Sequence, residues 1–155
     1  MNFHSQIEQI KSRLIEGRFR NEASISQGVV LPTLRALDWD VFNPESVFPE
    51  YPIGSKRVDF ALLNEGQRPI LLIEVKQPGR ADGADRQLFE YAFHQGVPFV
   101  LLTDGHEWHF YLPGELGNYD ERRVYKLDLI EREINEVVSH LNPPFHMELN
   151  LNSIN

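Results

Sequence analysis

Residues 97–103 (VPFVLLT) are apolar at nearly every position, and this stretch limits the possible folds more than any other. A strand that is apolar on both faces must be covered on both sides, which is typical of the centre of a sheet flanked by helices. Residues 69–76 form a second apolar strand, and residues 85–95, between the two strands, carry apolar side chains at helical spacing. This order predicts a right-handed crossover between parallel strands.

The other segments complete an α/β domain with a mixed central β-sheet flanked by helices. Pro32 lies within the second predicted helix, so we expect a kink near Gly28. The turn at 64–67 predicts a hairpin between the strands 57–63 and 69–76. The remaining predicted elements are helices at 5–15, 21–37 (with Asn21 as N-cap) and 128–141, an irregular edge strand at 41–48, and strands at 107–112 and 123–127.

Length and composition narrow the possible classes of protein. The 155 residues suit one domain, which we expect over 1–142, followed by an Asn-rich tail at 143–155. There is no cysteine, which excludes a disulfide framework, a thiolate nucleophile and a cysteine zinc site. Because no apolar run reaches the length of a signal peptide or a membrane span, we expect a soluble, cytoplasmic protein with no membrane partner.

The chain is acidic, with a formal net charge of -8 from 15 Lys and Arg against 23 Asp and Glu. This balance argues against a protein that holds nucleic acid by electrostatics alone. Acidic and basic residues are equal in number over residues 1–40, so the whole excess follows Val41. The extra carboxylates either form a solvated surface or gather around a cation.

Strand alternation brings charged side chains together in the segment ILLIEVK. Glu74 and Lys76 share one face of the strand with Leu72, and hairpin pairing can place Asp59 of the preceding strand beside Glu74. Two carboxylates this close repel each other unless a proton or a metal lies between them. Mg²⁺ (or Mn²⁺) suits such oxygen ligands, and Lys76 can then orient or deprotonate a water and offset charge on a phosphoryl oxygen.

An ordinary surface ion pair at the end of a strand explains Glu74 and Lys76 equally well. An acid-x-Lys triplet occurs roughly once by chance in a chain of this length. The position of the triplet favours a functional site, because it closes a strongly apolar strand directly before Gln77-Pro78-Gly79. It also follows a strand that has a lone acid, Asp59, at hairpin distance.

Several motifs in order resemble the PD-(D/E)xK nuclease superfamily, and specifically the N-terminal nuclease domain of type I restriction enzyme R subunits. They are V-D-F-A-L-L, P-I-L-L-I-E-V-K-Q-P-G, Q-L-F-E-Y, N-E-A-S-I-S-Q-G-V-V-L-P-T-L-R-A-L-D-W-D and F-V-L-L-T-D-G-H-E-W-H-F-Y. The resemblance spans about residues 21–112 and implies a restriction-endonuclease-like core over that range.

This resemblance implies a Mg²⁺-dependent DNA endonuclease that hydrolyses phosphodiesters. Asp59 and Glu74 would bind the metal, and Lys76 would be the catalytic lysine. Glu22 would be the helix acid that completes the site through water or metal. For Glu22 the alternative is compensation of the helix dipole in the first turn of a helix.

Gln87 and Tyr91 match the Q-x-x-x-Y element that this branch of the superfamily carries after its nuclease motif, where it is linked to DNA handling and cleavage. Their spacing of four places both side chains on one helix face. For Tyr91 the alternative is a core aromatic residue.

The chain also departs from the family pattern. Val58 stands where the superfamily often has proline, and no GxxxxGK sequence occurs, so the ATP-driven motor of a full R subunit is not expected in this chain. DNA is the expected partner, and the protein can depend on a larger restriction or phage component to reach it. Two alternatives stay open: a catalytically inactive nuclease-fold module that binds nucleic acid or a protein partner, and a purely structural or regulatory protein.

Two other motifs in D-G-H-E-W-H-F-Y have simpler interpretations. His106 and His109 fall on opposite faces of a strand, which argues against a shared zinc ion. Trp108 and Phe110 are expected in the core.

Overall fold

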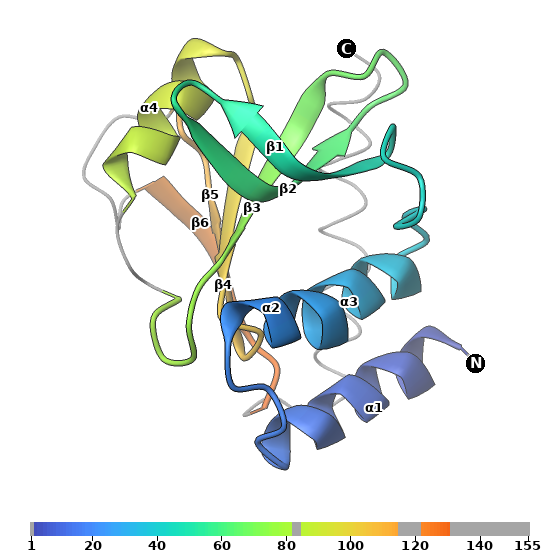
Figure 1. Cartoon of the computed structure of the whole chain (residues 1–155). Coiled ribbons are helices and arrows are strands. Elements are labelled where there is room, and N and C mark those ends of the chain that lie inside the picture. The colour runs from blue at the N-terminus through green and yellow to red at the C-terminus, as the bar shows by residue number, and fades with distance from the viewer. Residues whose placement is uncertain (1, 82–84, 115–121, 131–155) are drawn as a thin grey trace.

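The computed structural model describes residues 2–81, 85–114 and 122–130 of the chain. One six-stranded sheet with the order β1-β2-β3-β4-β5-β6 forms its centre (Figure 1). The strands are β1 (Val47–Ile53), β2 (Lys56–Leu63), β3 (Pro69–Val75), β4 (Phe99–Thr103), β5 (Glu107–Tyr111) and β6 (Arg123–Asp128). Strands β3 and β4 pair in parallel and the other neighbours pair antiparallel, which confirms the predicted mixed sheet.

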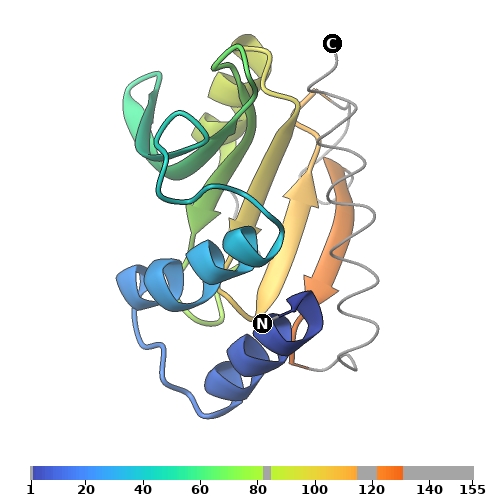
Figure 2. The same cartoon turned by 90° about the vertical axis from the view of Figure 1, so that its right-hand side faces the viewer.

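Helices cover both faces of this sheet (Figures 1 and 2). They are α1 (Phe3–Ile15), α2 (Glu22–Ile25), the π-helical segment η1 (Ser26–Val30), α3 (Leu31–Ala36) and α4 (Arg86–His94). One apolar cluster joins α1, η1 and α3 to the sheet, and it includes Ile73 and Val75 of β3. A second cluster joins α4 to the other face and includes Leu72. The alternation predicted for β3 is therefore confirmed: its even-numbered residues from 72 face α4.

The predicted second helix is divided into α2, η1 and α3 around a widened turn. Asn21 caps its start with a reciprocal capping box, as expected. The π-helical turn contains Gly28, where the kink was predicted, and Pro32 follows in the first turn of α3. Proline cannot donate a backbone hydrogen bond, and a π turn is one way for a helix to continue past the lost bond. A Cβ at Gly28 would collide with the ring of Phe19, so this position also requires a small residue.

The edge strand forms, but its predicted position is wrong. Residues 41–46 form turns, and β1 runs over Val47–Ile53 instead of 41–48. The prediction ended the strand too early because it treated the prolines as breaks. Pro49 and Pro52 are tolerated since β1 pairs with β2 alone, and an edge strand does not need every backbone N–H for pairing.

The remaining strands agree with the predictions. The hairpin β2–β3, the crossover through α4 and the central place of β4 are all confirmed. Trp108 is 1% exposed, and Phe110 packs against the same apolar cluster, as expected for core residues. Asp128 ends β6 rather than starting a helix; the rest of the predicted helix 128–141, from residue 131, and the tail 143–155 lie outside the described residues. Among the described residues no helix is long and apolar enough to cross a membrane.

Candidate active site

Asp59 and Glu74 face each other where β2 and β3 separate. The last paired residues on this side of the hairpin are Phe60 and Ile73, so the next positions are Asp59 and Glu74. The Asp59 carboxylate accepts a hydrogen bond from the backbone N–H of Val75 at 2.7 Å, which holds it between the two strands. The structure thus brings together the two acids that the sequence placed at hairpin distance.

Glu74 is in an environment that disfavours its charge. Its side chain is only 15% exposed, and burial is the main cause that raises the pKa of Glu74 to about 7. A hydrogen bond with Asp59 and the negative charge of Asp59 raise it further, while the Lys56 ammonium opposes the shift. Glu74 therefore takes up a proton more readily than an isolated carboxylate does.

Lys56 is a third charged residue of this site, and the sequence analysis did not identify it. Its Nζ lies 3.3 Å from Oε2 of Glu74 and 2.7 Å from Oδ2 of Asp85. Burial disfavours the charge of Lys56, but the hydrogen bond to Asp85 and the charges of both carboxylates outweigh it and raise the pKa of Lys56.

Asp85, the fourth charged residue, was expected as the start of a helix but not as part of the site. It is the N-cap of α4 and accepts a hydrogen bond from the backbone N–H of Leu88 at 3.1 Å. Burial opposes its charge, but the hydrogen bonds from Lys56 and Leu88 lower the pKa of Asp85. The helix cap was the signal that could have found this residue, because a capping carboxylate is fixed in space by the helix it starts.

Lys76 lies beside the acids without forming an ion pair with Glu74 among the described contacts. Its backbone N–H donates to the carbonyl of Thr103 at 2.7 Å, which extends the β3–β4 pairing one residue past Val75. Its ammonium lies 3.9 Å from Oδ2 of Asp85, and about a quarter of its side chain is exposed. Lys76 is therefore held next to the acids with an ammonium that solvent can reach.

Tyr91 contacts the turn between β1 and β2, and Gln87 supports Tyr91. The Tyr91 hydroxyl lies 2.6 Å from Oγ of Ser55, and Nε2 of Gln87 donates to the same hydroxyl at 3.0 Å. The Tyr91 ring packs against Gly54, where an added Cβ would lie 2.5 Å from ring atoms. The shared helix face is confirmed, and Tyr91, with Gln87 on its hydroxyl, holds the turn that leads into Lys56.

Glu22 is exposed in the first turn of α2. In the described part of the chain, no hydrogen bond or ion pair joins Glu22 to Asp59, Glu74 or Lys76. Its place at a helix N-terminus also fits dipole compensation, so its role in catalysis stays a prediction.

The pair of acids fits a magnesium ion through its chemistry. Asp59 and Glu74 offer hard carboxylate oxygens, and Mg²⁺ is usually bound by one or two carboxylates with water in the other positions. Within residues 2–81, 85–114 and 122–130, no group of three His, Asp or Glu side chains could hold a metal ion. A resident ion would thus depend on these two ligands and on water or phosphate.

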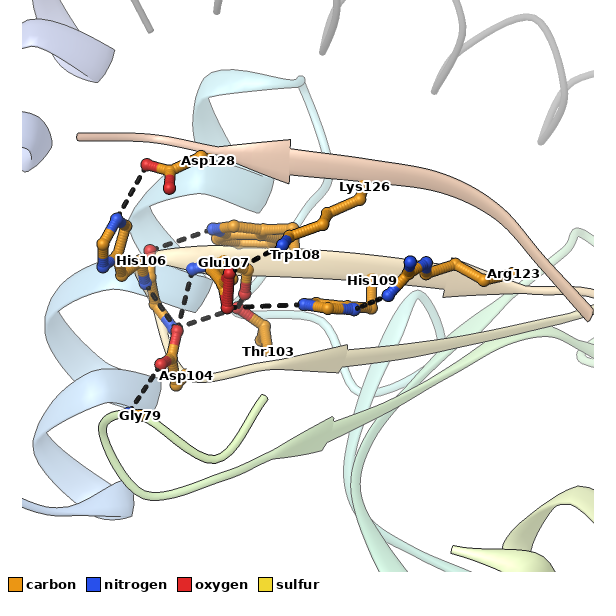
Figure 3. A network of polar contacts seen from close by, with 11 residues as sticks. Gly79, Thr103, Asp104, His106, Glu107, Trp108, His109, Arg123, Lys126 and Asp128 are labelled. Atoms are coloured by element: carbon orange, nitrogen blue, oxygen red, sulfur yellow. Dashed lines mark hydrogen bonds and ion pairs between the residues drawn. The ribbon is translucent and has the colours of Figure 1, made fainter. Parts of the chain in front are cut away.

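A second polar cluster lies at the turn between β4 and β5 (Figure 3). Asp104 is buried and accepts hydrogen bonds from the backbone N–H groups of Gly79, His106 and Glu107 at 2.8, 3.0 and 2.8 Å. Nε2 of His106 contacts Asp128 at 2.7 Å. This cluster ties the loop after β3 to the turn after β4.

A family model matches about half of the chain. Residues 42–120 match the family described as Type I restriction enzyme R protein N terminus (HSDR_N), a range that contains every predicted site residue except Glu22. No curated protein matches the sequence.

Three solved structures are similar to the chain, which spans a quarter or less of each. A fragment of a putative HsdR subunit of a type I restriction enzyme from Vibrio vulnificus YJ016 is 23% identical with a TM-score of 0.49, over 78% of this chain and 25% of that one. The type IIG restriction endonuclease BpuSI is 15% identical with a TM-score of 0.45, over 84% and 16%. The DrdV–DNA complex is 13% identical with a TM-score of 0.54, over 90% and 13%, which shows a shared fold.

The family match covers half of the chain and includes the strands and the helix that carry Asp59, Glu74, Lys76 and Tyr91. The protein belongs to the family of type I restriction enzyme R protein N-termini.

Proposed function

We propose that this chain is a Mg²⁺-dependent DNA endonuclease domain that hydrolyses phosphodiesters. The observation that carries the proposal is the half-buried pair Asp59 and Glu74: burial, and then the hydrogen bond and charge of Asp59, raise the pKa of Glu74 to about 7. Two carboxylates in such an arrangement repel each other and destabilise the fold. A divalent cation bound between them would offset that repulsion, which favours a metal site.

Asp59 and Glu74 would hold the metal in this proposal. A bound Mg²⁺ or Mn²⁺ supplies an activated water and stabilises negative charge on a phosphate oxygen. The Val75 N–H fixes the Asp59 carboxylate toward β3, so one ligand is already oriented before any cation arrives. Glu74 must release its proton to act as a ligand, and its pKa of about 7 makes that release easy slightly above neutral pH.

Lys76 would act on the phosphate. Its ammonium lies on the same side of the sheet as Glu74 and is partly open to solvent, so it can offset the charge that develops on a phosphoryl oxygen. Glu22 would add a carboxylate from α2 when DNA is bound, and Gln87 and Tyr91 would support DNA handling from α4.

DNA is the proposed substrate. The solved DrdV structure is of a DNA complex, and the present chain shares its fold. A net charge of -8 is unfavourable for binding DNA unaided, so we propose that a larger restriction component presents the DNA to this domain.

A second candidate function is a catalytically inactive module that binds a protein or nucleic acid. The contact between Lys56 and Glu74 favours this alternative, because an ammonium already compensates one of the two acids without a metal.

Plasmid cleavage distinguishes the two functions. The purified chain should nick or linearise supercoiled DNA with Mg²⁺ or Mn²⁺ and be inactive in EDTA. Lys76→Ala should lower the rate by about 10²-fold or more, which is the effect of removing one charge-stabilising donor. Lys126→Ala is the matched control, because Lys126 is ion-paired with Glu107 on β5 at 3.0 Å and should leave cleavage unchanged. Equal activity in Lys76→Ala would remove Lys76 from the mechanism, and no metal-dependent cleavage by the wild type would favour the inactive module.

A further inference from the structure

Lys56 bridges two carboxylates that belong to different parts of the fold. Its ammonium contacts Glu74 on β3 at 3.3 Å and Asp85 at the start of α4 at 2.7 Å. All three side chains are largely buried, with 22% of Lys56 and 15% of each acid exposed. Lys56 thus places one positive charge between the two carboxylates.

We propose that Lys56 is the resident counter-ion of the candidate metal site, that a divalent cation displaces it from Glu74, and that Asp85 retains it after displacement. This inference rests on the proposed function, because it assumes that Asp59 and Glu74 bind the cation. Lys56 and Asp85 would then set the affinity of the site for the cation.

Competition for Glu74 follows from charge and position. Lys56 contacts one of the two carboxylate oxygens of Glu74, and an ammonium and a divalent cation at the same carboxylate repel each other strongly. Lys56 and the cation therefore compete for Glu74. Metal binding includes the cost of moving the ammonium away.

Asp85 lowers the free-energy cost of displacing Lys56 from Glu74. The contact from Lys56 to Asp85 is shorter than the contact to Glu74, and Asp85 is fixed as the N-cap of α4. When Lys56 leaves Glu74, it keeps its closer partner and does not become an unpaired buried charge, which would cost several kcal/mol.

The turn before Lys56 is anchored, so that only its side chain needs to move. Gly54 has a positive φ of +59° and lies under the Tyr91 ring, and Ser55 contacts the Tyr91 hydroxyl. Gln87 donates to the same hydroxyl. In this inference Gln87 and Tyr91 are positioning residues that act on the site through Lys56.

Mn²⁺ titration of the intact chain, followed by calorimetry at pH 8, tests the inference without using activity. Lys56→Met should bind Mn²⁺ about tenfold more tightly than the wild type, because it removes both the competitor and its charge. Lys56→Arg, which keeps the charge, should bind within about twofold of the wild type. Lys126→Met removes the same charge elsewhere on the sheet and should also stay within about twofold of the wild type.

Substitution of Asp85 should change the Mn²⁺ affinity in the direction opposite to Lys56→Met. Asp85→Asn keeps an N-capping side chain but weakens the alternative partner of Lys56, so Mn²⁺ should bind several-fold more weakly. In the Lys56→Met background the same change should alter the affinity by less than about twofold. A loss of negative charge acting directly on the metal would instead weaken binding equally in both backgrounds, and that result would overturn the role of Asp85.

The outcomes separate this inference from the proposed function. Unchanged or weaker Mn²⁺ binding by Lys56→Met would overturn the inference, even if the wild type cleaves DNA through Lys76. Tighter binding by Lys56→Met in a protein that never cleaves DNA would support the inference and contradict the proposed nuclease. Binding by Lys56→Met alone, with none by the wild type, would support a blocked site, and binding by neither would overturn the inference together with the proposed metal site.

Discussion

Two clusters of polar side chains lie at the same end of the sheet, and they are satisfied in different ways. At the turn after β4, Asp104 accepts three hydrogen bonds from backbone N–H groups (Figure 3). At the end of β3, the partners of Glu74 are side chains: the carboxyl of Asp59 and the ammonium of Lys56. Backbone donors cannot leave without unfolding the turn, whereas a lysine side chain can.

This difference separates a structural cluster from a candidate functional one. A carboxylate that accepts several hydrogen bonds from backbone N–H groups holds the chain in place. A carboxylate beside another acid and a lysine side chain can instead change its partner: a proton, the lysine ammonium or a metal ion. We therefore expect substitutions at Asp104 to change stability, and substitutions at Glu74 and its partners to change pH dependence and metal binding.

Asp104→Ala should have the largest effect on stability. It removes the acceptor of three backbone N–H groups at a buried site, so we expect a loss of about 4 kcal/mol in the free energy of unfolding. Urea denaturation measures this loss. A change below about 1 kcal/mol would show that water replaces the carboxylate and that the turn is not a structural cluster.

Glu74→Gln should change how stability depends on pH. The pKa of Glu74 is raised from 4.5 to about 7, so its contribution to stability is complete below pH 4.5 and is lost as the pH rises through 7. In metal-free buffer the wild type should lose about 3 kcal/mol over this interval relative to Glu74→Gln, at about 1.4 kcal/mol for each pKa unit. Urea denaturation at several pH values measures the difference, and parallel curves for the two proteins would contradict the shift.

Gly54→Ala should destabilise the turn that leads into Lys56 by about 2 kcal/mol. The residue has a positive φ, which L-amino acids with a Cβ adopt at a cost of about 1–2 kcal/mol, and its Cβ would meet the Tyr91 ring. Thermal unfolding compares this variant with Gly66→Ala, which is in another turn and has no ring nearby. Equal stability of Gly54→Ala and the wild type would show that the ring moves aside freely.

Lys126→Met should have the smallest effect. Lys126 forms an ion pair with Glu107, but about half of its side chain is exposed, so the pair contributes about 0.5 kcal/mol or less. Urea denaturation should place this variant within that range of the wild type. A larger loss would mean that the outer ion pairs of β5 and β6 also belong to the structural cluster.

The sequence predicted those parts of the fold that depend on local patterns. Strand alternation identified the shared face of Leu72, Glu74 and Lys76, and the hairpin turn placed Asp59 opposite Glu74. The limits of β1 were predicted wrongly because prolines were taken as breaks, although an edge strand tolerates them.

The contacts of Lys56 and Asp85 could not be predicted in the same way. These residues are 29 positions apart, and they meet because the start of α4 lies beside the start of β2 in the folded chain. The periodicity of the strand that starts at Lys56 and of the helix that follows Asp85 does not predict this contact. The predicted site consisted of Asp59, Glu74, Lys76 and Glu22, with Gln87 and Tyr91 on a nearby helix, and the structure adds Lys56 and Asp85 beside Glu74 and Lys76.

The most direct test of the central claim is a calorimetric Mn²⁺ titration at pH 8 of two matched Glu→Gln variants. Glu74→Gln removes a proposed ligand, whereas Glu107→Gln removes a carboxylate of β5 that pairs with Lys126. Binding heat that is present in the wild type and in Glu107→Gln but lost in Glu74→Gln is the predicted result. Mn²⁺ binding by Glu74→Gln with the affinity of the wild type would contradict the claim that Asp59 and Glu74 hold the metal.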